Sequence, residues 1–299
     1  MKNKTLKRQN RFIPYAFVFP CLVFLVVFVY YPLIQNIVNS FTEYSGLSGK
    51  KTFIGFENYV NLSHDKIMKT ALINCLRYAV ISVICQVFFG MILASILEDP
   101  SFRFIAGFFR TIYFIPTVIS LTVICLLFGF IYNPRSGLLN AFLELIGLDS
   151  FTNAWLGKGS TAIYATIAVS QWQSIGYIMM LFIVAIQKVP VEYYEAAEID
   201  GASKIRKFFS ITLPQVREMF FVTMIITVSG SMTVFNEPYI LTKGGGPGTS
   251  SITMSLYMYQ LGFIRDRMGF GSTVAVFIFF LCVLLAILQS STFRTGKGE

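Results

Sequence analysis

The amino-acid sequence predicts an all-α integral membrane protein with six transmembrane helices. Hydrophobic residues make up 55% of the 299-residue chain and charged residues only 13%, which is outside the range of ordinary soluble domains. The apolar residues come in uncharged runs, each long enough for one helix to cross about 30 Å of hydrocarbon. Strands of a membrane barrel would be shorter and would alternate between apolar and polar residues, so the sequence excludes a barrel.

The six spans follow one another along the chain with polar connections between them. They are expected at approximately 13–34, 72–97, 109–132, 161–186, 218–240 and 270–291. A basic tail, 1–12, precedes them, and residues 13–299 are expected to form a single transmembrane domain. No small-residue cleavage pattern follows the first run, so this span is expected to stay in the protein as an anchor.

The basic residues predict the orientation of the chain. If the N-terminus faces the cytoplasm, the internal segments hold 14 Lys and Arg in 66 residues, against 10 in 100 residues for the external segments. An excess of basic residues on the inside is the general rule for membrane proteins, and six spans then place both termini in the cytoplasm. The same rule, with attraction to anionic lipid, accounts for the net charge of +9, so no nucleic-acid partner is expected.

Residues suited to catalysis or metal binding are scarce. The five cysteines lie in or beside apolar spans without a C-x-x-C pair, and His64 is the only histidine, so no metal site is expected. Two glycine-rich stretches, 46–52 and 244–251, lack the spacing of a phosphate-binding Walker loop. We therefore expect no catalytic residue, and if ATP is used, a partner must hydrolyse it.

The connection at 188–214 is unusually long and charged for a membrane protein. Its sequence predicts a helix with Pro190 in its first turn that stops at Gly201, where glycine can adopt a left-handed backbone. Ser203 is expected to cap a second short helix, and Pro214 to end it. Connections between packed helices usually have about 2–8 residues, so a docking element is favoured over a plain solvated loop.

Polar residues gather on one face of the fourth span and on the fifth. The candidate substrate-contacting residues are Ser170, Trp172, Gln173, Ser174 and Tyr177 on the fourth span, and Ser231, Asn236 and Glu237 on the fifth. Four of those on the fourth span follow the i, i+3, i+4, i+7 spacing of one helical face. Hydroxyl, amide and aromatic groups together suit a sugar, although Ser and Thr also join helices to one another. Glu237 is either a substrate contact or a charge in the outer loop.

The segment EAAEIDGASKIRKFFSITLP (195–214) resembles the Glu-Ala-Ala loop of binding-protein-dependent ABC importer permeases. Five further stretches resemble the carbohydrate branch of that family: FIGFENYVNL (53–62), FRTIYFIPTVIS (109–120), NPRSGLLN (133–140), AWLG (154–157) and YILTKGGGPGTSS (239–251). The resemblance covers nearly the whole chain after the basic tail.

The resemblance implies the type I ABC importer permease fold with a cytoplasmic coupling helix, in the cytoplasmic membrane of a bacterium. The residues implied in coupling to the ATPase are Glu195, Ala196, Ala197, Asp200, Gly201, Leu213 and Pro214. The implied partners are a second, homologous permease subunit, an ATP-binding cassette ATPase dimer, an extracytoplasmic solute-binding protein, a carbohydrate and the lipid bilayer. This chain would bind no cofactor, and the ATPase would use ATP and Mg, so the chain itself would not be an enzyme.

The expected function is that of a permease subunit in an ATP-driven importer, which moves a mono- or oligosaccharide by alternating access. Glycerol 3-phosphate or another polyol is the alternative substrate. The charged residues Arg77, Arg110 and Glu237 mean that a charged substrate is not excluded. A self-contained secondary transporter is less favoured, because such proteins usually carry charged residues within their spans or have repeated halves. A purely structural scaffold would not need a docking loop.

Overall fold

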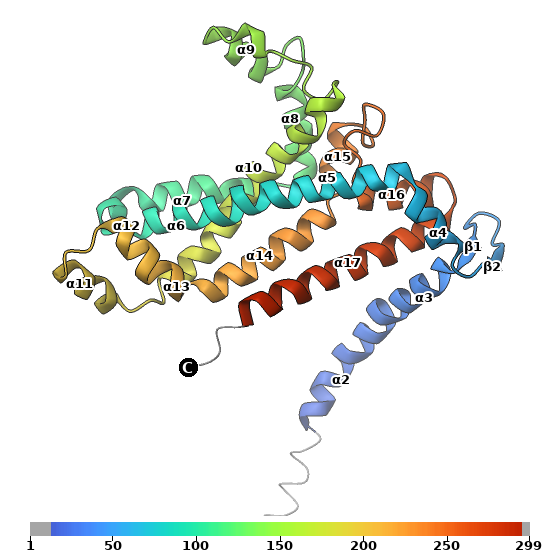
Figure 1. The fold of residues 1–299 in the computed structure, drawn as a ribbon, viewed down its shortest axis with the longest axis horizontal. Coiled ribbons are helices and arrows are strands. Elements are labelled where there is room, and N and C mark those ends of the chain that lie inside the picture. Colours follow the sequence, from blue (N-terminus) through green and yellow to red (C-terminus); the bar gives the residue numbers. More distant parts are fainter. Residues whose placement is uncertain (1–12, 295–299) are drawn as a thin grey trace, which may run out of the picture. The chain divides into compact units, whose positions relative to one another are not determined.

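The computed structural model describes residues 13–294, and the predicted basic tail at 1–12 lies outside the described residues. Helices dominate, with one two-stranded sheet (Figure 1). Two compact units can be distinguished, each drawn from two parts of the chain. One contains the residues up to His64 together with Met258–Phe277, and the other contains Asp65–Tyr257 together with the residues from Ile278 on.

The described residues contain five helices that are long and apolar enough to cross a membrane, and one bent pair that can supply a sixth span. The five are Pro14–Ser40, Lys66–Glu98, Gly159–Ile186, Arg217–Leu241 and Met268–Ser291. Each overlaps most of one predicted span. The prediction of an all-α integral membrane protein is therefore confirmed.

The first unit joins its apolar helix to a small hairpin. α2 (Ile13–Leu25) and α3 (Tyr31–Ser40) are linked by a π-helical turn, Val26–Tyr30. β1 (Thr42–Tyr44) and β2 (Lys51–Phe53) pair antiparallel, with Thr42 opposite Phe53, and α4 (Glu57–His64) follows. The side-chain amide of Asn58, on α4, donates to the carbonyls of Ser40 and Thr42, both at 3.0 Å, which ties α4 to the junction between α3 and the hairpin.

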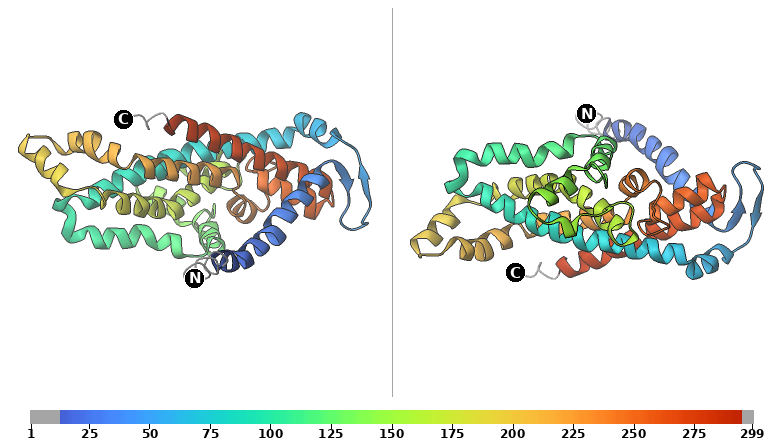
Figure 2. Two further views of the ribbon diagram at one scale, coloured as in Figure 1. Left: turned by 90° about the horizontal axis from the view of Figure 1, so that it is seen from below. Right: turned by 90° about the horizontal axis from the view of Figure 1, so that it is seen from above.

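The second unit contains the remaining helices. They are α5 (Lys66–Ser82), α6 (Phe89–Glu98), α7 (Arg103–Val118), α8 (Leu121–Ile131), α9 (Leu138–Leu145), α10 (Gly159–Ile186), α11 (Val191–Ile199), α12 (Lys204–Lys207), α13 (Leu213–Gln215), α14 (Arg217–Met232) and α15 (Asn236–Leu241). By their residues, α16 (Met254–Tyr259) and α17 (Met268–Arg294) belong to both units. α10 lies beside α6 and α7, and α14 lies beside α5 (Figure 2).

The third predicted span, 109–132, coincides with a bent pair of helices instead of one straight helix. α7 ends at Val118, α8 begins at Leu121, and the two are bent by 99°. Pro116 lacks an N–H donor and is followed by three β-branched residues, which weakens the helix here, while Ser120 is a favoured first residue for the helix that follows. An apolar run shows only that a segment is buried in lipid or in protein, so it could not reveal the bend.

The core of this unit forms around α10. Side chains of the second span, such as Met91 and Leu97, pack with Met179, Phe182 and other buried residues of α10. α7 approaches α10 at Gly176, where an added Cβ would lie 1.8 Å from the carbonyl oxygen of Tyr113. Only glycine allows two helices to come so close at this position.

Candidate functional site

A polar cavity of about 310 Å³ lies within the second unit, between the second, fourth and fifth spans. The residues that line it are Ser82, Gln86, Leu121, Ser170, Gln173, Ser174, Tyr177, Ile178, Ile226, Thr227, Gly230, Ser231, Thr233, Val234, Phe235, Asn236 and Glu237. Its volume is at the small end of the range for small-molecule sites. Hydroxyl and amide groups therefore meet in a half-open cavity among apolar helices.

Seven of the eight candidate substrate-contacting residues line this cavity. The four residues spaced i, i+3, i+4 and i+7 on α10 all face it, as the helical period requires. Trp172 is the exception: the cavity lining does not include it, and its ring packs edge-to-face on Phe128 at 5.4 Å. Each step along a helix turns a side chain by about 100°, so Trp172, two residues from both Ser170 and Ser174, points away from the face that these two share.

The second span also contributes to the cavity, which the sequence pattern did not predict. Ser82 and Gln86 line the cavity, and Gln171 joins them in a chain of hydrogen bonds. Gln86 Nε2 donates to Gln171 Oε1 at 2.9 Å, and Gln171 Nε2 donates to Ser82 Oγ at 3.0 Å. An amide inside an apolar span is costly unless it is hydrogen-bonded, and that cost was the signal available in the sequence.

The fifth span breaks where it meets the cavity. α14 ends at Met232 and α15 begins at Asn236, so residues 233–235 leave the helical ladder. Irregular backbone at membrane depth is tolerated where it lines a polar cavity. Thr227 Oγ1, one turn before the break, is buried without a hydrogen-bond partner within the described protein.

Glu237 is the acidic residue of the lining and is only 5% exposed. Its carboxyl group, on α15, interacts with the hydroxyl of Ser170 on α10. The structure thus places this carboxyl group in the cavity wall, in contact with the fourth span.

The 188–214 segment forms the second candidate site, and its turn has the predicted geometry. Gly201 follows α11 with a φ of 73°. The N–H of Ala202 donates to the carbonyl of Ala197 at 2.8 Å, and the N–H of Gly201 donates to that of Glu198 at 3.0 Å. This pair of bonds is a Schellman helix end. The predicted cap is also confirmed, because Ser203 Oγ accepts from the N–H of Arg206.

Pro214 does not end the second helix, contrary to the prediction. α12 continues through a π-helical turn, Phe208–Thr212, into α13, and the chain leaves the helix only at Val216, before α14 starts at Arg217. Proline removes one backbone donor and crowds the preceding turn. The wider π-helical turn directly before it changes the hydrogen-bond pattern at this point.

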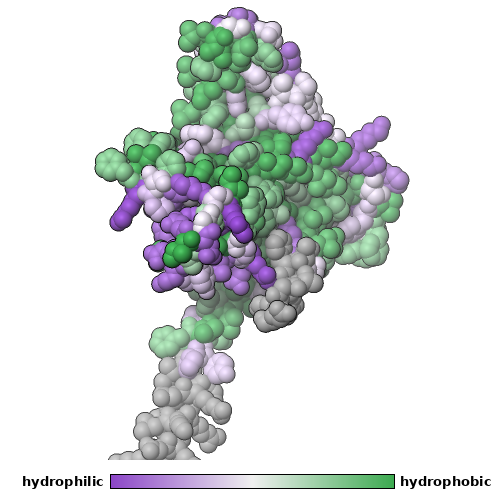
Figure 3. Space-filling model, turned by 60° about the vertical axis from the view of Figure 1, so that its left-hand side comes forward, coloured by the Kyte–Doolittle hydropathy of each residue, from purple (hydrophilic) through white to green (hydrophobic). Residues whose placement is uncertain are grey.

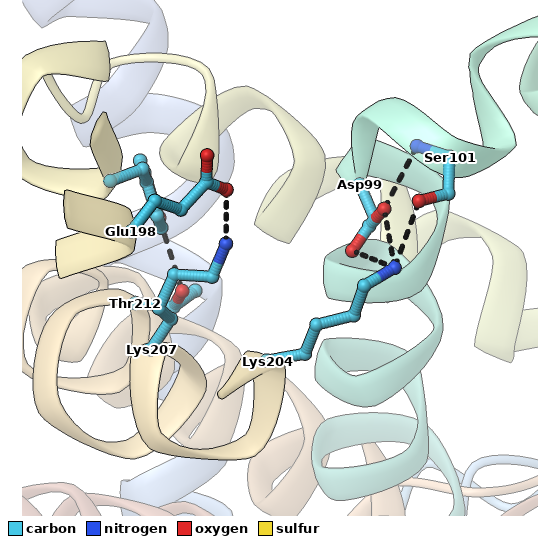
Figure 4. A network of polar contacts seen from close by, with 7 residues as sticks. Asp99, Ser101, Glu198, Lys204, Lys207 and Thr212 are labelled. Atoms are coloured by element: carbon cyan, nitrogen blue, oxygen red, sulfur yellow. Dashed lines mark hydrogen bonds and ion pairs between the residues drawn. The ribbon is translucent and has the colours of Figure 1, made fainter. Parts of the chain in front are cut away.

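Four polar contacts hold the 188–214 segment in place (Figure 4). Lys207 bonds to Glu198 at 2.5 Å, which ties α12 to α11, and Tyr194 Oη lies 3.0 Å from Thr212 Oγ1. Lys204 Nζ reaches out of the segment to Asp99 at 3.0 Å and to Ser101 at 2.9 Å. The segment is therefore joined to the connection between α6 and α7.

Asp99 is held in its charged form by these contacts. Partial burial raises the pKa of this carboxyl group, but hydrogen bonds from Ser101 and Lys204, with the Lys204 charge, outweigh burial and lower it overall. Lys204 is more than half exposed, so the pair contributes little to overall stability. Its effect is to orient α12.

α11 has no buried residue and carries both apolar and acidic side chains. Ile199 is 87% exposed, and Val191 and Tyr193 are also exposed. Figure 3 brings this side of the molecule forward and shows hydrophilic side chains gathered beside apolar ones. Of the residues implied in ATPase coupling, Glu195, Ala196, Asp200, Gly201 and Pro214 are exposed and Ala197 is half-buried, whereas Leu213 packs against the core around α10.

Comparison with known proteins agrees with this architecture. The sequence pattern of the family described as "Binding-protein-dependent transport system inner membrane component" matches residues 86–292. The probable ABC transporter permease protein YurN of Bacillus subtilis is 54% identical over 97% of this chain and 99% of its own. The lactose transport system permease protein LacF of Rhizobium radiobacter is 32% identical, covering 98% of both chains.

A solved structure has the same fold. It is a chain of a bacterial ABC transporter involved in the import of the acidic polysaccharide alginate, with a TM-score of 0.85 and 22% identity over 99% of this chain and 100% of that one. The family pattern covers more than half of the described residues, and relatives above 30% identity align along nearly the whole length. This chain belongs to the family of binding-protein-dependent transport system inner membrane components.

Proposed function

We propose that this chain is the permease subunit of an ATP-driven importer that carries a carbohydrate across the cytoplasmic membrane of a bacterium. The observation that carries the proposal is the polar cavity, in which hydroxyl and amide groups from three spans converge. A sugar offers many hydroxyl groups to such a lining. LacF is named for lactose transport, and the 31% identical permease AraP of Halalkalibacterium halodurans for arabinooligosaccharides, which supports the same substrate class.

The cavity disfavours the alternative substrate, glycerol 3-phosphate. A phosphate group is normally bound by Arg, Lys or several backbone N–H groups. The cavity lining contains no Lys or Arg and includes a carboxyl group, Glu237. A neutral polyol would still fit the hydroxyl and amide groups.

The 188–214 segment supports coupling to a partner ATPase. α11 is exposed, carries apolar side chains and follows α10 after a connection of only four residues, 187–190. A partner that seats α11 and changes shape on using ATP and Mg would therefore pull on the helix that forms the cavity wall. Alternating access requires two states with different affinity for that partner's conformations.

The remaining partners follow from the same arrangement. A second, homologous permease subunit would complete the pathway, and an extracytoplasmic solute-binding protein would deliver the carbohydrate at the opposite face. Both termini would then lie in the cytoplasm, on the same side as the 188–214 segment.

Reconstitution tests this function. The chain, its co-encoded permease and ATPase, and the solute-binding protein are placed in proteoliposomes, and uptake of labelled carbohydrate is measured with and without ATP. We expect uptake only with ATP and with all components, and no ATP hydrolysis by this chain alone. Uptake without ATP, or ATPase activity of the rigorously pure chain, would refute the proposal.

A further inference from the structure

The polar cavity contains one acidic side chain, Glu237, and no basic one. Glu237 extends from the first turn of α15 and is almost fully buried. Within the described part of the chain, side-chain ion pairs are found at Arg110–Glu98, Lys204–Asp99 and Lys207–Glu198. All three lie outside the cavity lining, so the protein itself supplies no neutralising charge there.

A carboxylate in this position is short of partners. Burial of a charge without a counter-charge is strongly unfavourable. A carboxylate has about four acceptor positions, and the contacts with its own backbone N–H and with the hydroxyl of Ser170 use two of them. A cation within the cavity would relieve this cost, and the cavity leaves about 310 Å³ for an occupant.

The rest of the lining narrows the chemistry of that occupant. Gln173, Ser174 and Tyr177 of α10 and Asn236 of α15 also line the cavity, and their amide and hydroxyl groups bind neutral hydroxyl groups. A bare metal ion would leave them unused and would meet a single carboxylate. A molecule with several hydroxyl groups and one protonated amine matches both parts of the lining.

We propose that the cavity selects an amine-bearing carbohydrate, whose ammonium group pairs with the carboxylate of Glu237 while its hydroxyl groups contact α10. This inference rests on the proposed function, since it names the substrate class within carbohydrate import. The competing account is that Glu237 is protonated and donates a hydrogen bond. In that case the cavity would bind a neutral sugar as tightly as an amine-bearing one.

The test is equilibrium binding to the purified complex of this chain with its partner permease and ATPase, in the absence of the solute-binding protein. The probes are two matched pairs, glucosamine with glucose and deacetylated chitobiose with N,N′-diacetylchitobiose, at a pH where the amines are protonated. A buried hydrogen bond to a charged group corresponds to roughly a tenfold to hundredfold change in affinity. We expect at least one amine to bind tighter than its neutral partner by that factor.

Variants of Glu237 separate the two accounts. Glu237→Gln keeps the shape and imitates the protonated side chain, so it should abolish the preference for the amine, whereas Glu237→Asp should keep part of it. Glu144→Gln changes the same charge on the exposed face of α9 and should keep the full preference. A preference that survives Glu237→Gln, or no preference for the amine in either pair, overturns the inference. ATP-dependent uptake of a neutral sugar with no such preference would overturn it while leaving the proposed function intact.

Discussion

Replacing Gly201 with valine tests whether the shape of the 188–214 segment transmits the effect of ATP to the membrane helices. Gly201 has a φ of 73°, and nothing lies within 4 Å of the position that a Cβ would occupy. The Cβ itself therefore meets no neighbouring residue, and the cost that the structure shows is that of the left-handed backbone. For an ordinary residue this cost is about 1–2 kcal/mol, and it is higher for a β-branched one.

The most direct way to relieve this cost is to move the turn. The two hydrogen bonds of the helix end, from Gly201 and Ala202, would be lost or displaced, and α11 would change its direction relative to α12. Whole domains are stabilised by about 5–15 kcal/mol, so a penalty of this size need not prevent folding. Insertion depends on the apolar spans, none of which contains Gly201.

The assay is substrate-stimulated ATP hydrolysis by the reconstituted complex, with co-purification of the ATPase subunit and yield in the membrane as accompanying measurements. Gly201→Val should lose most of the stimulation and retain less ATPase subunit, at normal membrane yield. Gly201→Asn is the matched control, because asparagine tolerates a left-handed backbone better than other side chains, and it should keep most of the coupling. Full stimulation and full ATPase retention in the valine variant would refute the reasoning.

Two further predictions concern the cavity and the contact between Lys204 and Asp99. Gln173→Ala should weaken substrate binding by about 1–3 kcal/mol, the range for a lost buried hydrogen-bond partner. Trp172→Ala should leave affinity nearly unchanged and lower thermal stability, because the Trp172 ring packs on Phe128 outside the cavity. An equal loss of affinity in both variants would contradict this assignment. The pKa of Asp99 is lowered in the folded protein, so the stabilisation from its contact with Lys204 is present above about pH 4 and is lost as the pH falls through the lowered value. Limited proteolysis of the 188–214 segment should be faster for Asp99→Asn than for the wild type at pH 7, and the difference should shrink under strong acidification; a difference that does not depend on pH would show that the charge is irrelevant.

The sequence predicted those parts of the structure that depend on local patterns. The i, i+3, i+4, i+7 spacing of polar residues identified the wall of α10, and the order Gly201, Ser203 identified a helix end followed by a cap. Each of these features involves residues within one or two turns of helix, so it can be predicted without knowing what packs against it.

Other parts depend on contacts between distant segments, and the sequence did not reveal them. The bend between α7 and α8 lies inside a continuous apolar run. Gln86 and Gln171 are far apart in sequence, and only the packing of α10 against the second span brings their amides together. Trp172 was placed in the cavity by its chemistry, yet the helical period directs it to another face. Residue type alone does not determine the direction of a side chain.

The helix α10 links the two candidate sites physically. Its middle carries the cavity wall, and its end leads through Gln187 to α11. Gln187 Nε2 donates to Glu98 at 3.2 Å, and Arg110 of α7 bonds to the same carboxylate at 2.5 Å.

Further along α10, Thr117 Oγ1 of α7 donates to the carbonyl of Gln173 at 3.0 Å, within three residues of the close approach at Gly176. α7 and α10 are thus joined beside the cavity, and both are joined to Glu98 of α6 near the 188–214 segment. Close-packed interiors transmit displacement rather than absorbing it, so a force on α11 is expected to move α7 and α10 together. The polar groups of α10 would then shift relative to those of α14 and α15 on the opposite wall, and this relative movement is what a change in access to the cavity requires.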